Sequence, residues 1–365
     1  MKTYLPFILW FLLAEAILFA VQFPLRKKQP RALVRVLLIL LKALLGIGFA
    51  ALMLAGPLFL RPVQPLMTGL YAALFTDAAA DAVYSLVCYL RDKRRNLFLL
   101  KAVSLVFGAA FVAFGIVNMQ SVRANYHTYS SPKLTREHTF VYLADLHVGG
   151  AQSFETTENT IREIISLSPD FIVLDGDITD DYTSKEEMLA TWELFRGCGC
   201  DVFYAYGNHD RQKHAEYANG LQYTPEELAD ALTACGVKIL KDEFCVISDD
   251  LVLLGREDLS EGDGRADIAS LHNPVPGAYL VVADHQPAGV KGNLACGMDL
   301  QVSGHTHAGQ LFPLRALYSL AGYVCGDYQV GDAILNVSAG ACGWRMPFRT
   351  DAHCAYEVIT LQPEQ

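Results

Sequence analysis

The chain has 365 residues, a formal net charge of −10 at pH 7, and 52% hydrophobic against 19% charged residues. This length predicts two domains or one domain with an appendage, and the hydrophobic excess excludes an ordinary soluble enzyme. The charge divides near residue 120: residues 1–120 carry a balance of +9 and residues 121–365 a balance of −19. No nucleic acid binding is expected of so acidic a domain, because phosphate backbones are bound by basic surfaces.

Four apolar stretches occupy the first 120 residues, and each is as long as the ~20 helical residues that cross a hydrocarbon core of ~30 Å. A soluble four-helix bundle would show a polar face every two turns, which these stretches mostly lack. A cleaved signal peptide would need a small-residue cleavage site, and none is clear after the first stretch. Residues 1–120 are therefore predicted to form a transmembrane four-helix anchor. The stretches run from about Tyr4 to Phe23, Ala32 to Leu60, Val63 to Leu90 and Leu97 to Met119.

Basic residues cluster in two of the three connections between these stretches. The positive-inside rule places both of these connections in the cytoplasm. We therefore expect a multi-pass protein of the cell membrane whose acidic domain is extracytoplasmic. The residues are Arg26, Lys27, Lys28 and Arg31 after the first stretch, and Arg91, Lys93, Arg94 and Arg95 after the third.

Two carboxylates, Asp77 and Asp81, fall within the third stretch at a spacing that puts both on one helix face. Acids inside a membrane are costly and often functional. The alternatives are that both face the interior of the bundle or that the span is broken near them. We assign them no role.

Beyond residue 135, short β-branched runs alternate with amphipathic segments, which predicts an α/β layered domain over residues 138–365. The polar residues 121–137 are expected to form a connector. The predicted strands are Thr139–Ala144, Phe171–Leu174, Val202–Tyr206, Leu251–Leu254, Tyr279–Ala283, Asp299–Val302 and Ala333–Val337, and the predicted helices include Thr156–Ser166, Lys185–Phe195 and Pro225–Cys235.

Five polar clusters each follow an apolar run, at the position where α/β sheets carry their ligand-binding loops. Their carboxylates, imidazoles and an amide, without thiolates, suit divalent ions such as Mn²⁺, Fe²⁺ or Zn²⁺ rather than a structural zinc–cysteine site. Each cluster alone is a weak signal, and only the ordered set predicts a metal centre. The clusters are Asp145-Leu146-His147, Gly176–Asp180, Gly207–Asp210, His285 and Gly304–His307.

The succession Asp-x-His, Gly-Asp-x-x-Asp, Gly-Asn-His-Asp, His and Gly-His-x-His resembles the calcineurin-like metallophosphoesterase family, in particular its branch with N-terminal transmembrane helices. The resemblance covers about residues 138–360. It implies a two-sheet sandwich flanked by helices, with two divalent metal ions (Mn, Fe or Zn) as cofactors.

The resemblance also implies roles for individual residues, carried over position by position. His209 would be the acid that protonates the leaving oxygen, Asp180 would orient His209, and Asp210 would brace the loop. The implied ligands are Asp145, His147 and His307 for the first metal, Asn208, His285 and His305 for the second, and Asp177 as the bridge between them.

Two features depart from the pattern of this branch. Asp284 precedes His285 where an uncharged residue is more usual, and it is expected either to support His285 or to face solvent. Arg345 and Arg349 are candidates for phosphate clamps, with ordinary surface arginines as the alternative.

The function implied is that of a metal-dependent phosphoester hydrolase, a phosphodiesterase or phosphomonoesterase, in which a hydroxide shared by the two ions attacks phosphorus. The membrane spans favour a membrane-proximal or lipid-linked substrate. A catalytically silent metal-binding sensor or scaffold is the alternative, and a channel or transporter, which would depend on Asp77 and Asp81 alone, ranks last.

Nine cysteines are present, eight of them beyond residue 120. In an extracytoplasmic domain they would allow up to four disulfides. Reduced thiols are the equal alternative.

Overall fold

The computed structural model describes residues 4–26, 31–55 and 62–364. These residues form two compact units. The helical unit comprises the N-terminal residues up to Val117 together with Arg345–Thr350. The α/β unit comprises Asn118–Trp344 and the C-terminal residues from Asp351 onward.

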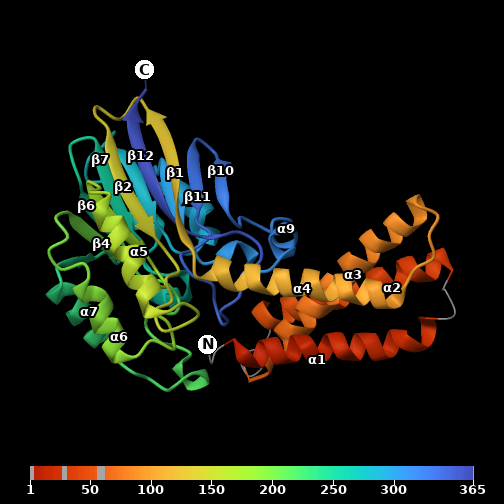
Figure 1. Cartoon of the computed structure of the whole chain (residues 1–365). Coiled ribbons are helices and arrows are strands. Elements are labelled where there is room, and N and C mark those ends of the chain that lie inside the picture. Colours follow the sequence, from red (N-terminus) through yellow and green to blue (C-terminus); the bar gives the residue numbers. More distant parts are fainter. Residues whose placement is uncertain (1–3, 27–30, 56–61, 365) are drawn as a thin grey trace. The chain divides into compact units, whose positions relative to one another are not determined.

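The four long helices of the chain are α1 (Leu5–Gln22), α2 (Ala32–Ala55), α3 (Gln64–Leu90) and α4 (Leu97–Met119) (Figure 1). Each is long and apolar enough to cross a membrane, which confirms the four predicted helices. The expected extension of the second stretch to Leu60 lies outside the described residues.

Close approach between these helices depends on glycine. A Cβ atom on Gly69 of α3 would lie 2.7 Å from the backbone nitrogen of Phe11 in α1. A Cβ atom on Gly108 of α4 would lie 2.5 Å from the Phe11 ring. Small residues allow helices to approach at such interfaces, where dispersion contacts rather than water exclusion stabilise packing in a membrane.

Asp77 and Asp81 lie in the interior of the helical unit, because α3 continues unbroken past both of them. Lys42 Nζ of α2 lies 2.7 Å from Asp77 Oδ2 and 3.0 Å from Asp81 Oδ2. Lys101 of α4 also pairs with Asp77, and Arg95 pairs with Asp81. The structure therefore agrees with the alternative in which both carboxylates face the interior of the bundle, and not with the one in which the span is broken near them.

Six residues from near the C-terminus complete the helical unit. Arg345 Nη1 donates to the Met53 carbonyl at 2.8 Å, and the Arg349 amide donates to the Gly115 carbonyl at 3.0 Å. The Phe348 ring centroid lies 5.2 Å from that of Phe7. Arg349 is fully buried, so the alternative of an ordinary surface arginine is wrong for it, whereas the expectations for the partly exposed Arg345 stay predictions.

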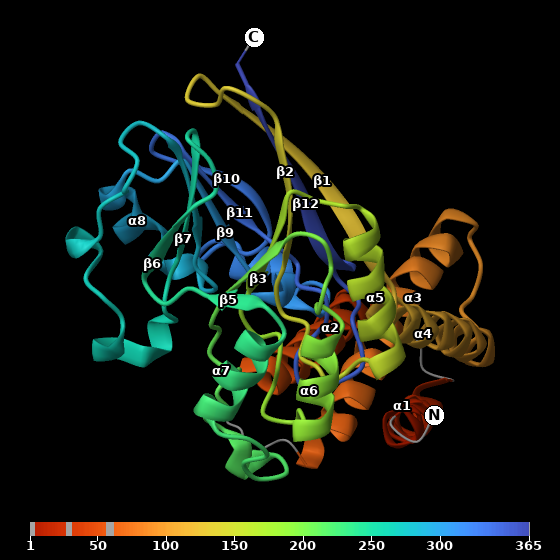
Figure 2. The same cartoon turned by 90° about the vertical axis from the view of Figure 1, so that its left-hand side faces the viewer.

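The α/β unit contains two six-stranded mixed sheets, one ordered β1-β12-β2-β3-β4-β5 and the other β10-β11-β9-β8-β7-β6 (Figure 2). The strands of the first are β1 (Val122–Ser131), β2 (His138–Leu143), β3 (Phe171–Asp175), β4 (Asp201–Ala205), β5 (Val237–Ile239) and β12 (Cys354–Pro363). Those of the second are β6 (Glu243–Val246), β7 (Leu251–Gly255), β8 (Tyr279–Ala283), β9 (Leu300–Ser303), β10 (Gly326–Val330) and β11 (Ala333–Val337).

The two sheets pack face to face through one apolar core. Phe171 and Phe203 from the first sheet meet Leu253 and Val281 from the second, and all four are buried. The outer face of the first sheet carries α5 (Phe154–Ser166), α6 (Lys185–Glu193) and α7 (Pro225–Ala234), and the second carries the short α8 (Val290–Asn293). The predicted two-sheet sandwich flanked by helices is confirmed.

Residues 121–137, expected as a connector, instead contain the edge strand β1. It pairs in parallel with β12 over ten residues, from Val122 opposite Cys354 to Ser131 opposite Pro363. Five strands, β1, β5, β6, β10 and β12, were not among those predicted. Among the described residues, which include all nine cysteines, there is no disulfide.

Candidate metal centre

The site is built at the ends of strands from both sheets. Asp145 and His147 follow β2, Asp177 follows β3, and Asn208 and His209 follow β4. From the second sheet, His285 follows β8, and both His305 and His307 follow β9. The sandwich therefore gathers the predicted ligands because the ends of these strands meet along one edge.

The backbone at this edge is strained. A positive φ is uncommon for residues other than glycine, and such conformations cluster at functional sites. Five of the seven predicted ligands adopt one: Asp145 (53°), His147 (44°), Asp177 (50°), His305 (70°) and His307 (48°).

Two glycines make room for the carboxylates. A Cβ atom on Gly207 would lie 2.3 Å from Asp177 Oδ1, and one on Gly304 would lie 2.5 Å from Asp145 Oδ2. Any side chain at either position would displace a predicted ligand.

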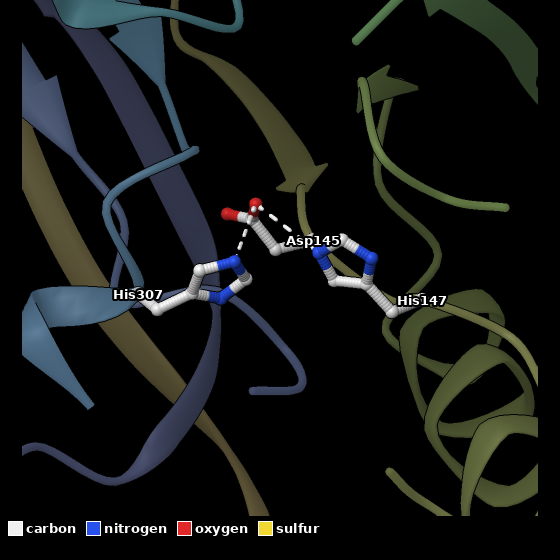
Figure 3. Close-up of side chains that lie close together, drawn as sticks. All are labelled: Asp145, His147 and His307. Carbon is white, nitrogen blue, oxygen red and sulfur yellow. Dashed lines mark ion pairs between the residues drawn. The ribbon is translucent and has the colours of Figure 1, made fainter. Parts of the chain in front are cut away.

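The first group of donors is Asp145, His147 and His307, whose side chains converge on one another (Figure 3). Asp145 Oδ1 lies 3.8 Å from His147 Nε2 and 3.7 Å from His307 Nε2. Two ligand atoms that each lie about 2.1 Å from one cation are separated by about 3.0–4.2 Å, depending on the angle between them. The three side chains therefore have the spacing of ligands to a shared ion.

The second group is Asp177, His285 and His305. Asp177 Oδ2 lies 3.1 Å from His285 Nε2 and also 3.8 Å from His147 Nε2 of the first group. This one carboxylate oxygen thus faces donors of both groups.

Buried atoms without hydrogen-bond partners provide a test of whether metal ions fit here. In the described part of the chain they include Nε2 of His147, Nε2 of His285 and Oδ1 of Asn208. Such atoms are rare in folded proteins, and each needs an explanation. Divalent cations bound by the two groups would satisfy all three, so the donor set fits metal ions of the kind that prefer oxygen and imidazole ligands.

Hydrogen bonds to backbone carbonyls orient two of the imidazoles. His285 Nδ1 lies 2.8 Å from the carbonyl of Asp175, and His307 Nδ1 lies 3.2 Å from that of Cys342. A carbonyl can only accept, so Nδ1 carries a proton in both rings, and the neutral form of each ring would present the lone pair of Nε2 to a cation. This arrangement is typical of metal-binding histidines.

The electrostatics of the site keep the carboxylates ionised. Burial opposes the charged form, but His307, His147 and His285 together lower the pKa of Asp145. Burial likewise opposes ionisation of Asp177, yet His285 and His209 hold its pKa well below the ordinary value. Burial and the neighbouring His285 lower the pKa of His305, which favours the neutral ring that a metal requires.

His209 is oriented by Asp181 and not by Asp180 as expected. His209 Nδ1 lies 2.7 Å from Asp181 Oδ2, whereas Asp180 Oδ2 lies 2.9 Å from His147 Nδ1. The reason is local, because Thr183 Oγ1 hydrogen-bonds the Asp180 amide at 2.7 Å and the turn directs the two adjacent carboxylates to different imidazoles. The doubled aspartate is the signal in the sequence that was missed.

Asp210 joins two of the loops. Its carboxylate accepts from the amides of Gly207 at 2.7 Å, Asp177 at 2.9 Å and Thr179 at 3.0 Å. These contacts agree with the expected bracing of the loop.

Asp284 follows neither of the two expectations for it. The residue is fully buried, and it pairs with both Nη atoms of Arg265, at 2.9 and 2.7 Å. Its partner is thus an arginine from the preceding loop rather than His285 or solvent.

Trp344 also lies at the site, with its ring centroid 5.2 Å from that of His209. Nothing in the sequence around it distinguishes it as a site residue.

The two-sheet sandwich gathers carboxylates and imidazoles at its strand ends in groups that could each hold a metal ion. Residues 138–309 match the model of the calcineurin-like phosphoesterase family. These residues therefore form a calcineurin-like phosphoesterase domain, a class of metal-dependent phosphoester hydrolase, and four helices long and apolar enough to cross a membrane precede it.

Three relatives illustrate the similarity. An uncharacterized metallophosphoesterase of Campylobacter jejuni is 28% identical over 312 residues, which cover 80% of this chain and 79% of that protein. One of Helicobacter pylori is 30% identical and covers 64% of this chain and 62% of its own length. A transmembrane protein with metallophosphoesterase domain from Danio rerio is 26% identical and covers 71% and 62%. The chain thus spans about three fifths of the length of the last two.

Proposed function

We propose that this chain is a dinuclear metal-dependent phosphoesterase, anchored in the cell membrane, that hydrolyses a membrane-proximal or lipid-linked phosphoester. The observation that carries the proposal is the position of Asp177. Its Oδ2 atom lies within 3.1 Å of a donor in one group and 3.8 Å of a donor in the other, as a carboxylate shared by two ions would.

In this proposal each ion has three ligands of its own and shares Asp177. When bound, two divalent cations polarise the phosphoryl oxygens and lower the pKa of water toward neutrality. Asp145, His147 and His307 would hold the first ion, and Asn208, His285 and His305 the second. Mn²⁺, Fe²⁺ and Zn²⁺ all suit this donor set.

His209 is the proposed acid. Asp181 accepts a hydrogen bond from Nδ1 and thereby stabilises the imidazolium form, in which Nε2–H can donate to the leaving oxygen. The positive charge of the His209 ring would also stabilise the negative charge that develops on the phosphoryl group.

The proposed location follows from the four helices and from the charge of their connections. A domain outside the cytoplasm, joined to helices in the bilayer, would meet phosphoesters at the membrane surface. The relatives named as transmembrane proteins with a metallophosphoesterase domain support the membrane anchor in this proposal.

The test uses the full chain in detergent, stripped of metal and then loaded with Mn²⁺, Fe²⁺ or Zn²⁺. We expect two metal ions per chain and hydrolysis of bis(p-nitrophenyl) phosphate. Asp177→Asn should remove at least one ion and lower turnover by roughly 10³-fold or more, because the shared ligand supports both ions. Asp263→Asn, at an exposed position of the 3-10 helix Leu259–Gly264, is the matched control and should behave as wild type.

Three results would count against the proposal. Full activity in Asp177→Asn overturns the shared carboxylate. One ion per chain in the wild type overturns the dinuclear site. Two ions without hydrolysis of any phosphoester, lipid extracts included, would favour the sensor or scaffold instead.

A further inference from the structure

A cavity of about 350 Å³ lies within the helical unit, lined by all four long helices. Eight of its lining residues are leucine or valine, and several of these, such as Leu41 and Leu45 of α2, are about half exposed. In a bilayer the exposed leucines would face lipid, so the cavity would open sideways into the hydrocarbon core. A chain of methylene groups could enter without crossing water.

One end of this cavity is polar and carries an excess of positive charge. Three basic side chains line it, Arg35, Lys42 and Arg95, against the single acid Asp81. Asp81 already pairs with both Lys42 and Arg95, and Lys42 pairs in addition with Asp77. The cavity therefore combines an apolar wall with a polar end whose positive charge suits an anionic group.

This polar end lies where the chain has its two basic connections. Arg35 is in the first turn of α2, and Arg95 lies two residues before the start of α4. All residues that line the cavity belong to the helical unit, whereas the predicted metal ligands all belong to the α/β unit. The cavity is thus distinct from the metal centre.

We propose that this cavity binds an anionic phospholipid, with its phosphate at Arg35, Lys42 and Arg95 and an acyl chain along the leucines of α1 and α2. Basic pockets between transmembrane helices on the cytoplasmic side bind anionic headgroups in this way. Guanidinium groups are suited to phosphate because they form paired, charge-assisted hydrogen bonds. The inference rests on the proposed membrane placement and does not depend on the proposed hydrolysis.

The test is native mass spectrometry of the full chain, released from nanodiscs that hold dioleoyl phosphatidylglycerol or phosphatidylcholine. We expect one phosphatidylglycerol to remain bound and phosphatidylcholine to be lost. Arg35→Gln should weaken retention about 10-fold, because it removes a charged donor. Leu45→Trp should do the same by filling the cavity.

Matched controls lie beside each variant. Arg94→Gln removes an exposed charge from the same connection as Arg95, and Leu44→Trp adds the same bulk one residue away; neither position lines the cavity. Both should retain phosphatidylglycerol as wild type does. Inorganic phosphate at millimolar concentration should not displace the lipid, and if it does, the ligand is a soluble phosphate compound.

Two further outcomes overturn the inference. One is equal retention of the two lipids, and the other is equal loss in the site variants and their controls, which would indicate ordinary boundary lipid. Hydrolysis of bis(p-nitrophenyl) phosphate is measured on the same samples to separate the two proposals. Asp177→Asn should keep the lipid and lose hydrolysis, whereas Arg35→Gln should keep hydrolysis and lose the lipid.

Discussion

Asp180 and Asp181 are neighbours in the sequence with separate tasks at the metal centre. Asp180 contacts His147, a predicted ligand, while Asp181 contacts His209, the proposed acid. Substitution of Asp180 and substitution of Asp181 should therefore have different effects, one on metal binding and the other on turnover.

Asp181→Asn should lower kcat roughly 10- to 100-fold with two metal ions retained, because a partner of a catalytic or metal-binding imidazole is worth about that much. Asp180→Asn should instead weaken metal binding at His147. Metal content by mass spectrometry, with kcat and its pH profile, separates the two. Retention of full kcat in Asp181→Asn, or loss of metal from it, would contradict the assignment.

His127 of β1 is held between two carboxylates. Nε2 lies 2.9 Å from Glu357 Oε2 and Nδ1 lies 3.5 Å from Asp327 Oδ2. Burial disfavours the charged ring, but these two carboxylates outweigh burial and raise the pKa of His127 to about 9. A raised pKa stabilises the fold below the unfolded value of about 6.5, and that contribution is lost as the pH rises through 9.

His127→Gln should therefore destabilise the α/β unit by on the order of 2 kcal/mol at pH 6, and by much less at pH 10. The measurement is the melting temperature of the full-length wild type and variant between pH 6 and 10. A difference that is constant across this range would show that the charge of His127 does not contribute.

At the scale of elements, the interior strands and the ligand loops could be predicted because their signals are local. Phe171–Leu174 and Tyr279–Ala283 are continuous apolar runs followed by polar clusters, and the structure has β3 and β8 there. The edge strand β1 could not be predicted in this way. Its residues are largely polar, and its hydrogen-bond partner β12 begins more than 200 residues later.

The same limit applies within the site. The seven candidate ligands could be proposed from their motifs, but the partner of His209 depends on which way a single turn directs two adjacent acids. The pairing of Asp284 with Arg265 likewise brings together residues 19 positions apart, and no local pattern indicates it.

Packing of α1 against α3 leads to a prediction for Gly69. Gly69→Ala would place a methyl group 2.7 Å from Trp10 and Phe11, and overpacking of this kind costs about 1–3 kcal/mol. Gly48→Ala is the matched control, because a Cβ atom there meets nothing within 4 Å. Maleimide labelling of Cys88, a buried residue of α3, should become faster in Gly69→Ala alone. Equal labelling of both variants would contradict this packing.

At the scale of the whole molecule, the helical unit is not confined to the N-terminal third of the sequence. Arg345–Thr350 belongs to it, and within it Thr350 Oγ1 lies 3.0 Å from the Tyr71 hydroxyl. A chain that begins at Asn118 keeps these six residues but loses their partners.

Such a truncated chain should associate through Met346 and Phe348, whose burial is worth about 1.5–3 kcal/mol each. Size-exclusion chromatography should show aggregates, and the double change Met346→Ser and Phe348→Ser should restore a monomer. The same double change should lower the melting temperature of the full-length protein. A monodisperse truncated chain without the two changes would disprove this expectation.

The late position of this segment also has a consequence for biosynthesis. The four helices emerge from the ribosome first, whereas Arg345 is translated 226 residues after Met119. At a translation rate of about 5–20 residues per second, Arg345–Thr350 is synthesised roughly 10–50 s after the last of the four helices. Insertion of the four helices and completion of the bundle are therefore separate steps of biosynthesis. A ribosome that stalls in the second half of the message leaves an unfinished bundle in the bilayer.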